Sequence, residues 1–179
     1  DDRRQPTFRN TDPIGQAMTV TYTVDVRPAY YQIMSGDTLN DIQGDINITD
    51  ASEIFTRGIS MNGPATGDWV TWGATLDGTA ANKMHDDGTN GDAVAGDSVY
   101  TVQFAYEATQ TIGQEFKFGI GGGDNESGYG LNHIENIDLT SGTVASYWGS
   151  INPNKYDAWN YDTNMPTLSI DEIHTSLTP

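Results

Sequence analysis

The regular alternation of apolar and polar residues constrains this fold more than any other feature of the sequence. Within residues 18–27, MTVTYTVDVR, every second side chain from Val20 to Val26 is apolar. Successive side chains of a β-strand point to opposite faces, so a period of two predicts a strand with one buried face. The same period recurs in residues 100–106 and 114–120. These stretches therefore predict three half-buried strands.

The last of these stretches, QEFKFGI, divides its side chains between the two faces of the strand. We expect Phe116, Phe118 and Ile120 to point inward. Their neighbours Glu115 and Lys117 are expected to point outward. Less regular strand candidates lie at residues 53–61, 69–76, 133–139 and 167–173. Short strands separated by turn-rich sequence predict an all-β chain that folds as one antiparallel, immunoglobulin-like β-sandwich.

The length of 179 residues fits one domain. We expect an extended N-terminal arm at residues 1–17, the β-sandwich at residues 18–160, and a C-terminal segment at residues 161–179 that forms a further strand. Cysteine is absent from the sequence, which excludes disulfides and thiolate metal sites. The sequence begins at Asp1 rather than Met, which suggests that a signal peptide was removed and that the protein is extracellular or at the cell surface.

The formal net charge is −17, from 25 acidic and 8 basic side chains. Such a charge repels phosphate groups and anionic lipids, so the sequence predicts neither nucleic-acid binding nor binding to a membrane surface. No apolar run approaches the roughly 18 residues of a membrane span, so membrane insertion is not expected. The charge favours divalent cations. The alternative is a generally acidic surface without a specific partner.

The order of several motifs resembles the immunoglobulin-like sandwich modules that bind starch and glycogen in secreted bacterial proteins. VTYTVDV is followed by IFTRGISMNGP, then by DGTNGDAVAGDSVYTVQF and EFKFGIGGGDNESG, all within residues 18–140. The resemblance implies a β-sandwich and, as one alternative, carbohydrate binding. Two features depart from the family pattern: the tryptophan of MNGPATGDW is displaced from the glycine, and the connection at residues 30–53 is long.

Residues 85–101, HDDGTNGDAVAGDSVYT, combine four aspartates with three glycines and contain no Lys or Arg. Ca²⁺ takes six to eight oxygen ligands, so this loop is a candidate Ca²⁺ site. Its candidate ligands are Asp86, Asp87, Asn90, Asp92 and Asp97. The alternative is a solvated turn whose side chains bond to the local backbone. A second acidic stretch with Asp41, Asp45 and Asp50 is a weaker candidate.

Several aromatic residues in turn-like sequence are candidates for stacking on sugar rings. These are Trp69, Trp72, Tyr129, Trp148 and Trp159. Because Trp69 and Trp72 are three residues apart, a regular strand would turn them to opposite faces, with one of them in the core. The alternative for each aromatic residue is a place in the core or over a sheet edge.

No catalytic pattern is found in the sequence. Its three histidines, His85, His133 and His174, lack metal-ligand spacing, and the HExxH and GxSxG motifs are absent. The glycine-rich stretch GIGGGDNESG does not fit a nucleotide-binding motif and is typical of a long hairpin loop. We therefore expect a protein that is not an enzyme.

The N-terminal arm suggests self-association. Phe8, Ile14 and Met18 are apolar residues that could set the register of an arm added to the sheet edge of another copy. Contacts of this kind, repeated head to tail, produce a filament. The sequence thus predicts a secreted or cell-surface structural protein that binds other copies of itself. The alternative is a soluble glycan-binding module that uses exposed Trp and Tyr.

Overall fold

Two three-stranded sheets form the framework of the structure, a computed structural model that describes residues 8–151, 159–160 and 165–166. The first sheet has the order β3–β1–β6, with β1 at Met18–Asp25, β3 at Val99–Tyr106 and β6 at Thr143–Tyr147. The second has the order β2–β4–β5, with β2 at Ile59–Asn62, β4 at Gly113–Ile120 and β5 at His133–Asn136. Strands β7 (Trp159–Asn160) and β8 (Met165–Pro166) pair with each other. The prediction of a β-rich chain is confirmed.

Strand β1 lies at the centre of the first sheet and pairs in two directions. It is antiparallel to β3, from Met18 opposite Tyr106 to Asp25 opposite Val99. Its pairing with β6 is parallel, so the prediction of antiparallel pairing throughout is wrong. Alternation of side chains is the same in parallel and antiparallel strands, and therefore it carries no information on strand direction.

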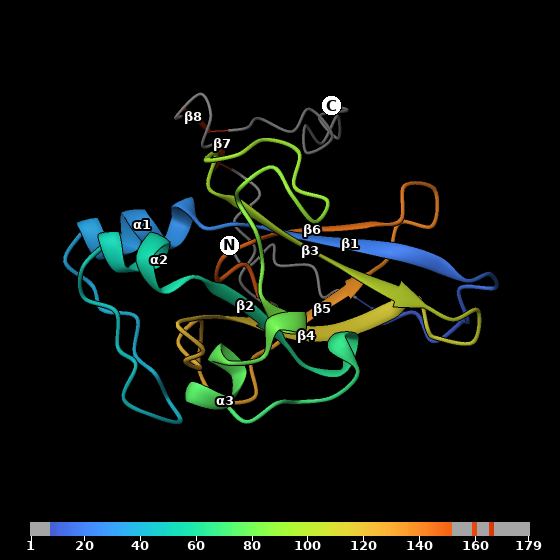
Figure 1. Cartoon of the computed structure of the whole chain (residues 1–179), viewed down its shortest axis with the longest axis horizontal. Coiled ribbons are helices and arrows are strands. Elements are labelled where there is room, and N and C mark those ends of the chain that lie inside the picture. Colours follow the sequence, from blue (N-terminus) through green and yellow to red (C-terminus); the bar gives the residue numbers. More distant parts are fainter. Residues whose placement is uncertain (1–7, 152–158, 161–164, 167–179) are drawn as a thin grey trace, which may run out of the picture.

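The two sheets lie in separate layers, with the hydrophobic core between them (Figure 1). The ring of Tyr22 in β1 packs edge-on against Phe116 in β4, with 5.2 Å between the ring centroids. The hydroxyl groups of Tyr22 and Tyr106 lie 2.6 Å apart, and that of Tyr106 also donates to the carbonyl oxygen of Ala65 at 2.7 Å. The inward direction predicted for Phe116 and its apolar neighbours in β4 agrees with their complete burial.

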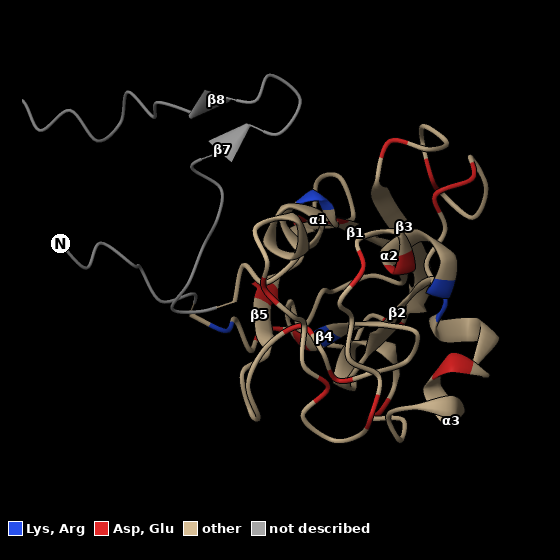
Figure 2. Ribbon diagram, turned by 90° about the vertical axis from the view of Figure 1, so that its left-hand side faces the viewer, with Lys and Arg blue, Asp and Glu red and all other residues tan. Residues whose placement is uncertain are grey.

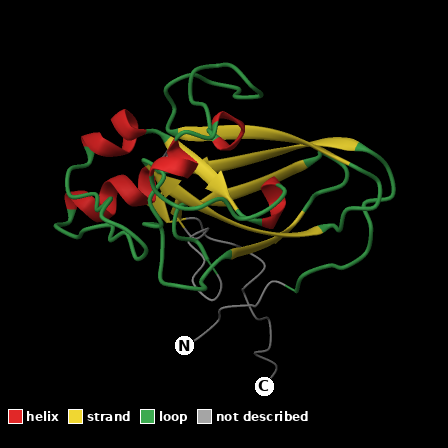
Figure 3. Cartoon of the chain, turned by 60° about the horizontal axis from the view of Figure 1, so that its bottom comes forward, coloured by secondary structure: helices red, strands yellow, loops and turns green. Residues whose placement is uncertain are grey.

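The described residues also form three short helices. They are α1 (Arg27–Met34), α2 (Ser52–Arg57) and α3 (Ala74–Asp77), and 3₁₀ turns occur at Pro64–Thr66 and Ala80–Asn82. Two of the helices, α2 and α3, overlap segments that were predicted to be strands. Helices α1 and α2 lie together at one end of the sheets (Figure 3). No helix in the described ranges has the length and apolar character needed to cross a membrane.

The strand predicted at residues 53–61 is wrong over its first half, which forms α2. An ion pair between Glu53 and Arg57, one helical turn apart at 2.6 Å, favours the helix. The side chain of Asp50 accepts a hydrogen bond from the Ser52 amide near the start of this helix. Gly58, with φ of 76°, then separates the helix from β2. Residues 53–61 have no regular alternation that would exclude a helix.

The strand predicted at residues 69–76 is also wrong, because a side chain takes the place of a neighbouring strand. The Asn62 amide group accepts a hydrogen bond from the Val70 amide at 2.8 Å and donates to the Val70 carbonyl at 2.9 Å. This pair of bonds holds the segment as a loop that leads into α3. The strand predicted at residues 133–139 is confirmed for β5, whereas the candidate at 167–173 lies outside the described residues.

The described part of the N-terminal arm packs against its own domain. The Ile14 amide donates to Gln110 at 2.8 Å, and the Gly113 amide donates to Asn10 at 2.7 Å. Ile14 is only 5% exposed, whereas Phe8 is 82% exposed. Met18 lies in β1 and packs partly buried against the core. Ile14 is therefore part of the hydrophobic core of its own chain in this structure.

Candidate functional site

A cleft of about 460 Å³ lies beside β4 and is lined by aromatic and polar side chains. Trp69 and Trp72 come from the loop after β2, and Tyr129 comes from the loop between β4 and β5. The rings of Trp69 and Trp72 lie 6.2 Å apart and are tilted by 43°. Trp69 is 39% exposed and Tyr129 is 83% exposed. Three of the five aromatic residues predicted to contact a sugar therefore meet in one cleft.

The prediction that Trp69 and Trp72 face opposite sides is wrong because their segment is not a strand. Both side chains line the same cleft. Gly119 makes room for this arrangement in β4, since a Cβ there would lie 2.9 Å from the Trp72 ring. The loop that carries the two tryptophans also contacts the β4–β5 loop, where the Gly73 amide donates to the Gly122 carbonyl at 2.7 Å. The two aromatic loops are thus joined.

A buried ion pair forms one wall of the cleft. Lys117 and Asp124 are in contact, and each residue is 2% exposed. The Lys117 Nζ also donates to the carbonyl oxygens of Ser127 at 3.0 Å and Gly128 at 3.3 Å. Gln43 Nε2 donates to Asp124 Oδ2 at 2.6 Å. The ammonium group of Lys117 is therefore surrounded by oxygen atoms of the protein: two carbonyl groups that accept its hydrogen bonds, and the carboxylate with which it forms an ion pair.

The outward direction predicted for Lys117 agrees with the structure, yet the side chain is buried. Lys117 points away from the core between the sheets, but the β4–β5 loop covers this face of β4. The Nζ atom also lies 6.0 Å from the centroid of the Trp72 ring. Alternation correctly predicted the face of β4 on which Lys117 lies. It could not predict that a loop covers this face, because the loop is held there by contacts of Lys117 with residues 7 to 11 positions later.

Trp148 does not contribute an exposed sugar platform, because it is 1% exposed. It lies in the wall of a second cleft of about 540 Å³ on the other side of the β4–β5 loop. Beside it, Glu126 Oε1 accepts hydrogen bonds from His133 Nε2 at 2.8 Å and from the Gly149 amide at 2.9 Å. His133 is fully buried and stacks on Phe116. This pair therefore anchors the loop. The side chain of Trp159 lies outside the described part of the chain.

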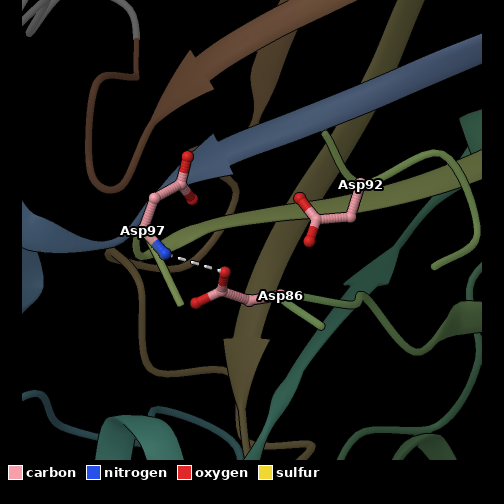
Figure 4. Close-up of side chains that lie close together, drawn as sticks. All are labelled: Asp86, Asp92 and Asp97. Carbon is pink, nitrogen blue, oxygen red and sulfur yellow. Dashed lines mark hydrogen bonds between the residues drawn. The ribbon is translucent and has the colours of Figure 1, made fainter. Parts of the chain in front are cut away.

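The acidic loop brings together three of its five predicted ligands. One carboxylate oxygen from each of Asp86, Asp92 and Asp97 lies within 4.8 Å of the others (Figure 4). Asp87 is not part of this group and accepts hydrogen bonds from Thr89. The Asn90 side chain donates to the Thr89 hydroxyl. A metal ion at this loop would therefore have Asp86, Asp92 and Asp97 as its carboxylate ligands.

The carboxylate of Asp86 also organises the loop without a metal. It accepts hydrogen bonds from the amides of Gly96 at 2.7 Å, Asp97 at 3.1 Å and Ser98 at 3.1 Å. Burial raises the pKa of Asp86, and the hydrogen bonds from these amides offset part of the increase. These bonds are those of a turn stabilised by an aspartate, which is the alternative that the sequence left open.

The second acidic stretch forms no comparable group within the described ranges. Asp41 is buried and its carboxylate accepts hydrogen bonds from the amides of Gln43, Ile46 and Asp124. Asp50 bonds to Ser52, which lowers the pKa of Asp50. Acidic residues are distributed over many loops, with few Lys and Arg among them (Figure 2). Asp41 therefore supports the wall of the cleft, because it holds the backbone of Asp124.

Comparison with protein-family models, with curated proteins and with solved structures finds no match to this chain. The resemblance to starch- and glycogen-binding modules therefore rests on the sequence motifs. Sequence reasoning missed the polar residues of the cleft, Gln43, Lys117, Asp124 and Asn132. The cleft joins segments up to 89 positions apart, between Gln43 and Asn132, and no local motif marks such a contact.

Proposed function

We propose that this chain is a non-catalytic module that binds polysaccharide in the cleft around Trp69, Trp72 and Tyr129, as part of an exported protein with an immunoglobulin-like sandwich. The observation that carries the proposal is the convergence of these three aromatic residues, from two loops, on one cleft of about 460 Å³. The motifs that resemble starch- and glycogen-binding modules support the same function.

The cleft offers the two kinds of contact that a sugar requires. The faces of a pyranose ring carry C–H groups that pack on aromatic rings, and the half-exposed Trp69 and the exposed Tyr129 present such rings. The hydroxyl groups of a sugar need hydrogen-bond partners, and Gln43 and Asn132 present amide groups in the same cleft. The Asn132 amide also donates to Glu115 Oε1 at 2.8 Å, which restricts its orientation before a ligand binds.

Affinity electrophoresis through gels that contain amylose, xylan, mannan or β-glucan tests this function. We expect at least one polysaccharide to retard the protein, and the Trp69→Ala substitution to weaken binding about tenfold, as expected for loss of a central aromatic contact. Phe55→Ala is the matched control, because Phe55 is 44% exposed on α2 and does not line the cleft. Equal retardation of the Trp69→Ala variant and the original protein would contradict the assignment.

Self-association through the N-terminal arm is an alternative proposal that receives less support. Of the three arm residues, Ile14 is buried in its own core and Met18 is partly buried, which leaves Phe8 exposed. A Phe8→Ser variant therefore tests this alternative. Loss of oligomers in sedimentation velocity would favour assembly through the arm, whereas monomers in both proteins would argue against it.

A further inference from the structure

We infer that Asp124 determines the charge selectivity of the cleft: by neutralising Lys117, it makes the cleft select neutral sugar chains and reject carboxylated or sulfated ones. This inference rests on the proposed polysaccharide function. It concerns the wall of the cleft, where Lys117 is the only Lys or Arg among the lining residues that the structure describes. The inference therefore depends on whether this single cation can interact with a ligand.

The ammonium group of Lys117 is enclosed by the protein and is not accessible to an anionic ligand. Its Nζ contacts Asp124 and donates to the carbonyl oxygens of Ser127 and Gly128. The residue is 2% exposed, so an incoming carboxylate would have to displace one of these buried partners. Displacing Asp124 would leave a second carboxylate buried without its cation, which is strongly unfavourable.

The other described residues that line the cleft provide no positive charge in place of the neutralised Lys117. Gln43 and Asn132 provide neutral amides, and the aromatic residues provide ring faces. The protein as a whole carries a formal charge of −17, which repels polyanions at long range. A neutral sugar chain has no such penalty, because hydroxyl groups and ring faces match these side chains. The contacts thus predict a preference of the cleft itself, in addition to general repulsion.

Two derivatives of one polysaccharide measure this preference. The polysaccharide that binds most tightly in the electrophoresis experiment is carboxymethylated or hydroxyethylated to the same degree, so that size is matched and charge differs. Affinities for soluble fragments of both are measured by titration calorimetry at low and high salt. For the unaltered protein we expect at least about tenfold weaker binding to the carboxymethyl derivative at low salt, and a smaller difference when salt screens the charges.

The Asp124→Asn substitution tests whether the preference for neutral sugar chains depends on the ion pair. It leaves the charge of Lys117 uncompensated at the cleft, so affinity for the carboxymethyl derivative should rise severalfold relative to the neutral one. Glu107→Gln is the matched control, since Glu107 is exposed at the end of β3 and the change in net charge is the same. Equal selectivity in the two variants would overturn the role of Asp124.

A double variant keeps the inference testable if Asp124→Asn does not fold. Combining Lys117→Gln with Asp124→Asn removes both charges. The ratio of the affinities for the neutral and the carboxymethyl derivative should therefore stay within about threefold of that of the original protein. A larger change would overturn the inference. Equal binding of both derivatives by the unaltered protein would overturn it as well, while leaving polysaccharide binding intact. If no polysaccharide of either charge binds, the proposed function itself fails.

Discussion

In the aromatic cleft, Lys117 and Asp124 neutralise each other inside the protein. In the acidic loop, three carboxylates lie close together without a basic side chain as partner in the part of the chain that the structure describes; they belong to Asp86, Asp92 and Asp97. Within the described residues, no ion pair involves these three aspartates. The acidic loop is the more conspicuous feature of the sequence, and its three carboxylates accept hydrogen bonds from backbone amides of the loop. No sequence motif marks the cleft, although aromatic rings and side-chain amides line it.

The difference shows that the densest group of charged residues in a sequence need not lie where the structure forms a cleft. In the cleft, the paired charges are buried, whereas ring faces and side-chain amides are exposed. In the acidic loop, Asp86 uses its oxygens to accept three backbone amides. The two regions should therefore respond differently to substitution, and the predictions below are ordered by the expected size of the effect.

Removing the buried cation of the cleft should give the largest loss of stability. The Lys117→Met substitution leaves Asp124 buried without its partner, and we expect the free energy of unfolding to fall by about 3–5 kcal/mol. Urea denaturation measures this change. The control is Lys83→Met, because the side chains of Lys83 and Asp77 are 28% and 48% exposed, and a pair in contact with solvent should contribute about 0–1 kcal/mol. Similar losses in the two variants would show that the pair in the cleft is not energetically special.

Removing the organising carboxylate of the acidic loop should have a smaller effect. Asp86→Ala removes the acceptor of three amide hydrogen bonds at a partly exposed site, so the expected loss of stability is about 1–2 kcal/mol. Asp45→Ala, in the other acidic stretch, is the exposed control. Urea denaturation in the presence of EDTA separates this effect from any bound metal. An unchanged midpoint for Asp86→Ala would contradict the role of Asp86 in organising the loop.

Calcium binding by the loop is the prediction with the smallest expected effect. If a Ca²⁺ ion binds to Asp86, Asp92 and Asp97, millimolar Ca²⁺ should raise Tm by a few degrees, and EDTA should reverse the change. The Asp92→Asn variant should lose this response. A Tm that is the same in Ca²⁺ and EDTA would leave the loop as a turn stabilised by Asp86.

The response to Ca²⁺ should also depend on pH. Because the folded-state pKa of Asp86 is raised, this group favours folding below its unfolded pKa and loses that contribution as pH rises through the raised value. A cation needs the ionised form, so the Ca²⁺-dependent increase in Tm should grow over the same range of pH. Differential scanning fluorimetry at several pH values measures both trends. An increase in Tm that is independent of pH would indicate a site that does not include Asp86.

Local patterns predicted the strands whose side chains alternate over seven or more residues. Strands β1, β3 and β4 follow from such alternation because each places apolar side chains of one face in the core; in β4 the other face is covered as well, by the β4–β5 loop. Trp148 lies in a turn, as its surroundings suggested, but its side chain is buried rather than exposed. Alternation gave the direction of Lys117, but it could not predict that a loop buries this side chain.

The site itself could be predicted only in part. Three aromatic residues of the cleft were recognised from their turn-like surroundings, and three aspartates of the acidic loop from their spacing. The polar groups of the cleft depend on long-range contacts, such as the bond between Gln43 and Asp124, which are 81 positions apart. Contacts of this kind depend on how the loops cover the sheets, and side-chain periodicity carries no information on that packing.

The most direct test of the proposed site is an NMR titration that follows the tryptophan indole N–H signals during addition of the polysaccharide fragment that binds. Trp69 and Trp72 line the cleft, whereas Trp148 is buried outside it, so each reports on a different region. We predict that the signals of Trp69 and Trp72 shift while those of Trp148 and of the Gly88 and Gly96 amides in the acidic loop stay in place. Shifts confined to the acidic loop, with Trp69 and Trp72 unchanged, would contradict the account.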